Sequence, residues 1–238
     1  MNTNPESGVL QHGRSRKVVK RSNCGHPVKF ASQKCGRSVH LESPLESPLE
    51  YDLAIQLEFD PSVILFQEQP LALKIEYNGK IRTVYPDLAV YKDDGSTLII
   101  EVKDAKKASQ QEVIEKFELE RQVLVSLGYD FVVMTDKEIR GTIQHKNSSK
   151  LLPYRRLVIG SILREKVLGA LAWRPMSLGE MLQEVPGVTL DLLKACIAQS
   201  VITTDLTQIV TLQSIVQPLR RNSKLSENQM KIWERRCL

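Results

Sequence analysis

Two acids and a lysine stand close together in the stretch YPDLAVYKDDGSTLIIEVK, residues 85–103. Asp87 follows a proline, and Glu101 and Lys103 end an otherwise aliphatic segment that comes after a turn. Successive side chains of a β-strand point to opposite faces, so Glu101 and Lys103 share one face. The preceding strand, as the partner, can place Asp87 beside Glu101. The spacing therefore predicts two carboxylates and an ammonium group gathered at one point.

These charged groups suit a metal-dependent hydrolysis. Two carboxylates that converge from adjacent strands repel each other unless a cation lies between them. Mg²⁺ fits that place because it takes oxygen ligands and retains waters. Lys103 can then help to deprotonate a bound water or neutralise charge on a phosphate, which describes in-line hydrolysis of a phosphodiester. The alternative for Glu101 and Lys103 is a solvated ion pair at a strand end.

A third acid is expected from LESPLESPLEYDLAIQLEFD, residues 41–60, in which ESPL is repeated. Ser47 and Glu50 form a capping box with proline at the first helical position, which predicts a helix from residue 48 to about 59. Glu50 falls within the apolar arc of that helix, where an acid is costly without a partner. We therefore predict that Glu50 completes the site. Two alternatives remain open: Glu50 only caps the helix, or Glu46 takes its place through the duplicated register.

The elements that position these residues predict a mixed α/β sheet flanked by helices. Strands are expected at residues 62–66, 71–77, 80–91, 96–103 and 130–135, with Asn78-Gly79 as a hairpin turn. Pro86 should bend or break the third of these strands. A helix opened by a capping box at Ser109 and Glu112 should end at Gly128, so that strand, helix and strand form a crossover with a parallel strand pair.

The rest of the chain predicts a second, smaller domain. Residues 144–150 are interpreted as a linker, followed by helices within 157–173, 177–185 and 190–199 and a short hairpin within 201–212. Three helices and then a hairpin is the order of a winged helix-turn-helix. We therefore expect four parts: a basic arm (1–40), a nuclease domain (41–148), a winged-helix-like domain (149–216) and a basic tail (217–238).

The positive charge is concentrated at the N-terminus. The 238 residues carry a formal charge of +5, and 42% of them are hydrophobic, which is enough for true cores. Among the first 40 residues, Glu6 is the single acid. A basic arm on a near-neutral body suits a polyanion such as DNA. The residues predicted to bind DNA are Arg14, Arg16, Lys17, Lys20, Arg21, Lys29, Lys34 and Arg37.

Other features of the sequence predict a cytoplasmic protein that does not bind membranes; the resemblance described below implies that it is bacterial. No apolar run approaches the roughly 20 residues of a membrane helix, and no signal peptide follows Met1. The four cysteines are scattered and are expected to be reduced thiols. The alternative of a zinc site at Cys24, His26, Cys35 and His40 lacks a C-x-x-C pair and fits no usual spacing.

The motifs resemble a known family of nucleases. Pro86-Asp87, a turn and Glu101-Val102-Lys103 match the PD-(D/E)xK pattern of restriction-type endonucleases. Together with QKCGRSVHLES, SPLEYDLAIQLEFDPSVILFQEQP and VVMTDKEI, they resemble TnsA, the endonuclease subunit of heteromeric cut-and-paste transposases. The resemblance implies a restriction-endonuclease-like fold with Glu50, Asp87, Glu101 and Lys103 as catalytic residues. It also implies the Val102 carbonyl as a metal ligand beside the three acids, and two Mg²⁺ ions that Mn²⁺ can replace.

The resemblance further implies a function and partners. TnsA proteins cut the 5′ strands at transposon ends, TnsB-like transposases cut and join the 3′ ends, and a TnsC-like ATPase regulator contacts the C-terminal domain of TnsA. We thus expect DNA transposition with two copies of the chain per complex, one for each end. The alternatives are a free-standing restriction-like or resolvase-like nuclease and a non-catalytic adaptor. The intact set of four charged residues argues against the adaptor.

Overall fold

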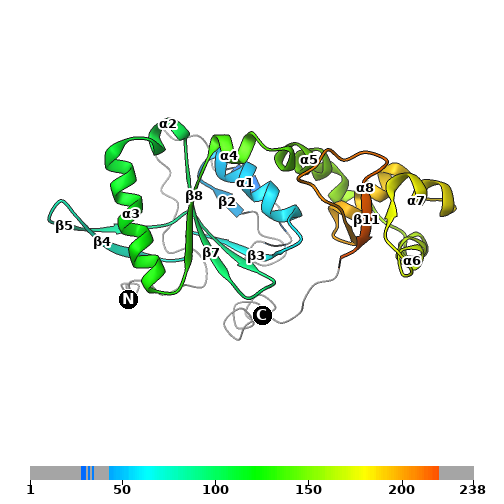
Figure 1. The fold of residues 1–238 in the computed structure, drawn as a ribbon, viewed down its shortest axis with the longest axis horizontal. Helices are drawn as coiled ribbons and strands as arrows, with labels where there is room; N and C mark the ends of the chain where they lie inside the picture. The colour runs from blue at the N-terminus through cyan, green and yellow to red at the C-terminus, as the bar shows by residue number, and fades with distance from the viewer. Residues whose placement is uncertain (1–27, 31, 33, 35–42, 220–238) are drawn as a thin grey trace. The chain divides into compact units, whose positions relative to one another are not determined.

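A computed structural model describes residues 28–30, 32, 34 and 43–219 of the chain (Figure 1). The described residues divide into two compact units. The first unit holds the residues up to Glu58 together with Ser62–Ile139, and the second holds Phe59–Pro61 and the residues from Arg140 onward. The predicted domain boundaries at residues 40, 148 and 216 stay predictions. No helix in the described part of the chain is long and apolar enough to cross a membrane.

The first unit is built on a four-stranded sheet in the order β3-β6-β7-β8. Its strands are β3 (Val63–Glu68), β6 (Leu88–Lys92), β7 (Thr97–Lys103) and β8 (Asp130–Thr135). The first two pairings are antiparallel, whereas β7 and β8 are parallel because the chain crosses over between them through helices. The predicted mixed sheet flanked by helices is therefore confirmed.

The crossover contains two helices, α2 (Ala105–Ala108) and α3 (Gln111–Ser126). Asp104 caps α2 by accepting hydrogen bonds from the backbone N–H groups of Lys106 and Lys107. Ser109 ends this short helix, and α3 starts after Gln110 without a side-chain cap. The predicted capping box at Ser109 is therefore wrong, because Asp104 starts a helix one turn earlier.

A two-stranded hairpin, β4 (Leu73–Tyr77) and β5 (Lys80–Val84), precedes the central strands. Asn78 and Gly79 turn the hairpin with positive φ angles of 53° and 67°, as an Asn-Gly turn requires. The next strand, β6, starts only at Leu88. The predicted break at Pro86 is thus confirmed, and it leaves Asp87 immediately before β6.

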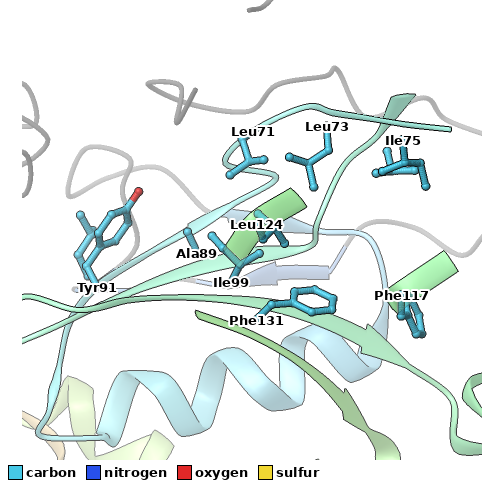
Figure 2. Close-up of a cluster of buried hydrophobic side chains, with 11 residues drawn as sticks. Leu71, Leu73, Ile75, Ala89, Tyr91, Ile99, Phe117, Leu124 and Phe131 are labelled. Atoms are coloured by element: carbon cyan, nitrogen blue, oxygen red, sulfur yellow. The ribbon is translucent and has the colours of Figure 1, made fainter. Parts of the chain in front are cut away.

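The core of this unit packs α3 and the hairpin against the sheet. Figure 2 shows the cluster, whose members are Leu65, Leu71, Leu73, Ile75, Val84, Ala89, Tyr91, Ile99, Phe117, Leu124 and Phe131. Ile99 of β7 belongs to the same cluster as Phe117 and Leu124 of α3. Because side chains alternate along β7, Glu101 and Lys103 point to the same face as Ile99. The core thus holds α3 over this face of the sheet, where it contacts β4 and β8.

The helix α1 (Pro48–Phe59) follows a small antiparallel pair, β1 (Val28–Phe30) and β2 (Ser43–Leu45). The predicted span of α1 is confirmed at both ends. Its inner residues Leu53, Ala54 and Leu57 are buried, and each large aliphatic side chain so buried contributes roughly 1.5–3 kcal/mol. This packing holds the N-terminal turn of α1, with Glu50, in a fixed place.

The second unit is mainly helical and begins within α4 (Asp136–Arg140). Its further elements are α5 (Ile143–Leu151), the 3₁₀ helix η1 (Leu152–Arg156), α6 (Ser161–Ala170), β9 (Met176–Ser177), α7 (Leu178–Glu184), α8 (Leu190–Ala198), β10 (Ile202–Thr203) and β11 (Ile215–Pro218). The three strands form an antiparallel sheet in the order β10-β11-β9. The three predicted helices are present, and Ser177 and Glu180 form a capping box on α7.

Two expectations for this unit are wrong. Residues 144–150, interpreted as a linker, lie in α5, which is capped by Thr142 and held by Asn147. The Asn147 side-chain amide donates to the carbonyl oxygens of Leu206 and Gln208, at 2.8 and 2.7 Å. The hairpin predicted within residues 201–212 is also wrong. The strand that returns to pair with β10 is β11, which lies later in the chain and pairs with β9 as well.

Candidate active site

Asp87 is fixed by the backbone of the neighbouring strand. The register of β6 and β7 pairs Leu88 with Ile100, which places Asp87 across from Glu101. The Val102 N–H group donates a 2.8 Å hydrogen bond to Asp87 Oδ2. Burial raises the pKa of Asp87 to about 6, while this hydrogen bond and the charge of Lys103 act in the opposite direction. The aspartate is therefore a half-buried carboxylate held in one orientation.

Glu101 and Lys103 lie where the sequence predicts them, at the end of β7. Burial raises the pKa of Glu101 well above its ordinary value, and the negative charges of Asp87 and Glu120 raise it further. Lys103 opposes that rise. The structure thus brings the predicted carboxylates and ammonium group together at one end of the sheet, with Glu101 buried.

Glu50 caps α1 and also lies near Asp87. Its Oε1 accepts a 2.8 Å hydrogen bond from the Ser47 hydroxyl, and its Oε2 accepts a 2.9 Å bond from the Glu46 N–H group. Ser47 Oγ in turn accepts the Glu50 N–H at 3.1 Å. Burial raises the pKa of Glu50 to about 7, and the charge of Asp87 adds to the rise. The capping role and the proximity to the other acids therefore coexist.

Glu120 is an acid of this cluster that the sequence argument missed. It lies on α3, is only 1% exposed and forms an ion pair with Lys116 at 3.4 Å. Burial raises its pKa, and its charge contributes to the raised pKa values of Glu101 and Asp87. A signal was present: Glu120 stands three residues after Phe117 and four before Leu124, on the apolar face of α3. An acid on such a face is costly without a partner, as was argued for Glu50.

The donor set fits a hard cation that keeps part of its water shell. In the described residues, no group of three or more His, Cys, Asp or Glu side chains is arranged to hold a metal ion. The carboxylates of Asp87 and Glu101 nevertheless adjoin, with the Val102 backbone between them. In a strand, the N–H and C=O groups of one residue point to the same side, so the Val102 carbonyl faces Asp87. Two carboxylates and a carbonyl suit Mg²⁺, which is bound through few protein oxygens.

Most of the residues predicted to bind DNA cannot be placed. Arg14, Arg16, Lys17, Lys20, Arg21 and Arg37 lie outside the described residues, and so do the four Cys and His residues of the zinc alternative. Lys29 lies on β1. Lys34 is 4% exposed, and its Nζ donates to the Leu57 carbonyl oxygen at 3.3 Å. That Lys34 binds DNA stays a prediction.

Comparison with known proteins identifies the family of the segment that carries the strand residues. Residues 60–136 match the model of the family described as TnsA-like endonuclease N terminal. The match includes Asp87, Glu101, Lys103 and Glu120, whereas Glu50 lies before it. Comparison with curated proteins gives no significant match. The resemblance drawn from the motifs is thus confirmed over this segment, which is similar to the N-terminal domain of TnsA-like endonucleases.

Proposed function

We propose that this protein is a Mg²⁺-dependent DNA endonuclease that cleaves the 5′ strands at transposon ends, as a subunit of a heteromeric transposase in cut-and-paste transposition. The observation that carries the proposal is the pair of the half-buried Asp87 and the buried Glu101, held beside Lys103 at the end of two paired strands. Carboxylates with raised pKa values are costly to keep ionised together, and a divalent cation offsets that cost. The family match of residues 60–136 supports the same chemistry.

Each residue of the site has a distinct role in this proposal. Asp87, Glu101 and the Val102 carbonyl would hold the cation, which would supply a lowered water pKa and positive charge opposite the phosphate. The Val102 N–H group orients the Asp87 carboxylate. Glu50 supplies a third negative charge from α1, where its two hydrogen bonds fix its position.

Lys103 acts on the developing charge of the reaction. Its ammonium group is close enough to Asp87 and Glu101 to lower the pKa values of both. A phosphodiester gains negative charge on its oxygens as the bond to the attacking oxygen forms. An ammonium group fixed at that place stabilises this charge more than it stabilises the substrate, and it can hold the attacking water.

The second unit is proposed to be a winged-helix-like module that docks a partner. The element order α6, β9, α7, α8, β10, β11 and the sheet order β10-β11-β9 support a winged helix. In that fold the third helix, here α8, usually enters the DNA major groove. Six of the nine residues of α8 are buried, and α8 packs against η1 and α5.

The polar side chains of α8 and its C-terminal cap are engaged within the unit. Gln199 donates from Nε2 to the carbonyl oxygens of Leu157 and Tyr154, at 2.6 and 3.3 Å. Lys194 Nζ donates to the Tyr154 hydroxyl at 3.1 Å and to Asp191 Oδ1 at 3.3 Å. These bonds favour protein docking over groove binding through α8. The partner proposed for this unit is the TnsC-like regulator, and the TnsB-like transposase supplies recognition and 3′ cleavage.

A cleavage assay tests the proposed activity. The chain, its TnsB-like and TnsC-like partners and labelled transposon-end DNA are incubated with Mg²⁺ or with EDTA. Asp87→Ala should abolish the Mg²⁺-dependent cut. Asp94→Ala is the matched control, because Asp94 is an exposed aspartate in the turn before β7 whose side chain caps Ser96. Equal cleavage by the wild type and Asp87→Ala would refute the site, and loss of cleavage in both variants would show a loss not specific to the site.

A further inference from the structure

Gln69 adopts a strained backbone conformation beside the candidate site. It directly follows β3, is 3% exposed and has a φ of 42°. Positive φ is uncommon for a residue other than glycine, and the residue before a proline, here Pro70, favours extended conformations. Such a conformation is energetically costly and persists only where the surroundings enforce it. The surroundings of Gln69 therefore need an explanation.

The hydrogen bonds of Gln69 connect two acids of the site. Its backbone N–H donates to the Asp87 carbonyl oxygen at 2.8 Å. Its side-chain Nε2 donates to Glu46 Oε1 at 2.9 Å, and the Glu46 N–H donates to Glu50 Oε2 at 2.9 Å. A continuous path thus runs from Asp87 through Gln69 and Glu46 to Glu50. It joins the start of β6 to the first turn of α1.

The side-chain amide can take only one orientation in this path. An ionised carboxylate accepts hydrogen bonds and donates none, so the amide nitrogen must face Glu46. Gln69 Oε1 then faces away from Glu46, and it is buried without a hydrogen bond from any described residue. A buried acceptor without a donor is destabilising. The strained φ and this acceptor accompany the bond of the amide donor to Glu46.

We propose that Gln69 is a positioning residue that sets the separation of Glu50 from Asp87 by holding Glu46 and the Asp87 backbone at once. This inference rests on the proposed nuclease function of the same site. Glu46 links Gln69 to the start of α1 through its two hydrogen bonds. Glu46 is the second acid of the ESPL repeat, and the nuclease motif assigns it no role. The charge of Glu46 also reaches both Asp87 and Glu50, so its placement matters to the whole cluster.

An exchange of the two side chains tests the proposal. Gln69→Glu places a second carboxylate against Glu46 and removes the amide donor, and it should slow 5′-strand cleavage by the complete complex about 10- to 100-fold. In the double variant Glu46→Gln with Gln69→Glu, the amide at position 46 donates to the carboxylate at position 69. The pair then has one donor, one acceptor and the net charge of the wild type. It should recover the rate to within a few-fold of the wild type. Gln56→Ala is the control, because it removes another buried glutamine amide, bonded to the Ile139 carbonyl oxygen.

Two further arms keep the result decisive. Gln69→Gly accepts the positive φ without strain and lacks the amide, so it should fold and still cleave at least 10-fold more slowly. The second arm measures, without DNA, how much Mg²⁺ raises the melting temperature of each variant. Gln69→Glu should need a higher Mg²⁺ concentration than the wild type for the same rise. The double variant should need about the wild-type concentration. Wild-type behaviour of Gln69→Gly, or a double variant no better than Gln69→Glu, would overturn the proposal. If the wild type shows no Asp87-dependent cleavage, the proposed function fails, while the melting data still decide the role of Gln69.

Discussion

Asp87 and Val102 are joined by a hydrogen bond of 2.8 Å from the Val102 N–H group to Asp87 Oδ2. β6 starts only at Leu88, after Pro86, so the backbone register of β6 and β7 ends at the pair Leu88 and Ile100. Beyond that pair, the aspartate side chain is the acceptor for the Val102 N–H group. The same bond that completes the sheet edge therefore orients a carboxylate toward Glu101. Fold and site are coupled at this one contact.

The raised carboxyl pKa values predict how the stability of the metal-free protein depends on pH. The folded protein holds protons on Glu50 and Asp87 up to pH values near 7 and 6, whereas the unfolded chain releases them near pH 4. The free energy of unfolding should thus decrease as pH rises from about 4 to 7, by about 1–3 kcal/mol for each group. Urea unfolding in EDTA at pH 5 and pH 8 measures this. A stability that is constant or higher at pH 8 would contradict the assignment.

Asp87→Asn should stabilise the metal-free protein at pH 8 by roughly 1–2 kcal/mol. The amide removes a charge that burial disfavours, and its carbonyl oxygen can still accept the Val102 N–H. The variant should also lose the stabilisation that Mg²⁺ gives the wild type. Urea unfolding with and without Mg²⁺ checks both effects, with Asp94→Asn as the exposed control. Destabilisation of Asp87→Asn in EDTA would mean that the aspartate charge is already neutralised within the protein.

Lys103→Met should separate metal binding from catalysis. The acids keep their positions, so Mg²⁺ should still raise the melting temperature, but the rate of cleavage should fall at least about 100-fold. Because the Lys103 charge lowers the pKa values of Asp87 and Glu101, its removal should shift the decrease in metal-free stability to higher pH. Single-turnover cleavage and thermal melting measure the two effects. Cleavage at the wild-type rate would exclude Lys103 from the chemistry.

Glu120→Gln should lower the pKa of Glu101, because one of the two negative charges that raise it is removed. The metal-free variant should be more stable than the wild type at pH 8. Half-maximal cleavage should need more Mg²⁺, because the site has lost a negative charge. Glu118→Gln is the matched control on the same helix, since Glu118 is 57% exposed and pairs with Arg121. An equal Mg²⁺ requirement in both variants would place Glu120 outside the site.

Because the polar side chains of α8 and its cap form hydrogen bonds within the unit, their substitution should leave DNA binding unchanged. Gln199→Ala removes two hydrogen bonds to backbone carbonyls and should cost roughly 1 kcal/mol of unfolding free energy. DNA affinity and its salt dependence should stay at wild-type values, because neither α8 nor its cap contacts phosphate in this account. Urea unfolding and salt titrations of DNA binding provide the measurements. A smaller salt slope in Lys194→Met would instead place α8 on the DNA.

The sequence predicts this fold well where local signals and packing agree. Asn78-Gly79, Pro86 and the capping box at Ser47 set the limits of strands and of α1, and all three operate in the structure. The capping box at Ser109 failed because Asp104, five residues earlier, caps a separate short helix. The linker failed because Asn147 and Ser148 are polar residues that are buried in α5, and the bonds of Asn147 come from residues about 60 positions later.

For the candidate site, the strand acids follow from alternation, whereas the other parts depend on tertiary packing. Glu120 reaches Glu101 only because the core packs α3 against the hairpin and the sheet. The left-handed conformation of Gln69 has no local sequence signal, since a residue before proline is expected to be extended. The two roles of Glu50 could not be separated in the sequence, and the geometry combines them.

Strand-specific cleavage of a transposon end tests the central claim most directly. Each DNA strand carries its own label, and the chain is tested alone, with its TnsB-like and TnsC-like partners, and as Asp87→Ala within the same mixture. Mg²⁺-dependent 5′-strand cuts should need the partners and disappear in Asp87→Ala, while the 3′ strands are still cut. If the 5′ strands are cut equally in the mixture with Asp87→Ala, the carboxylates at the end of β7 are not the nuclease site.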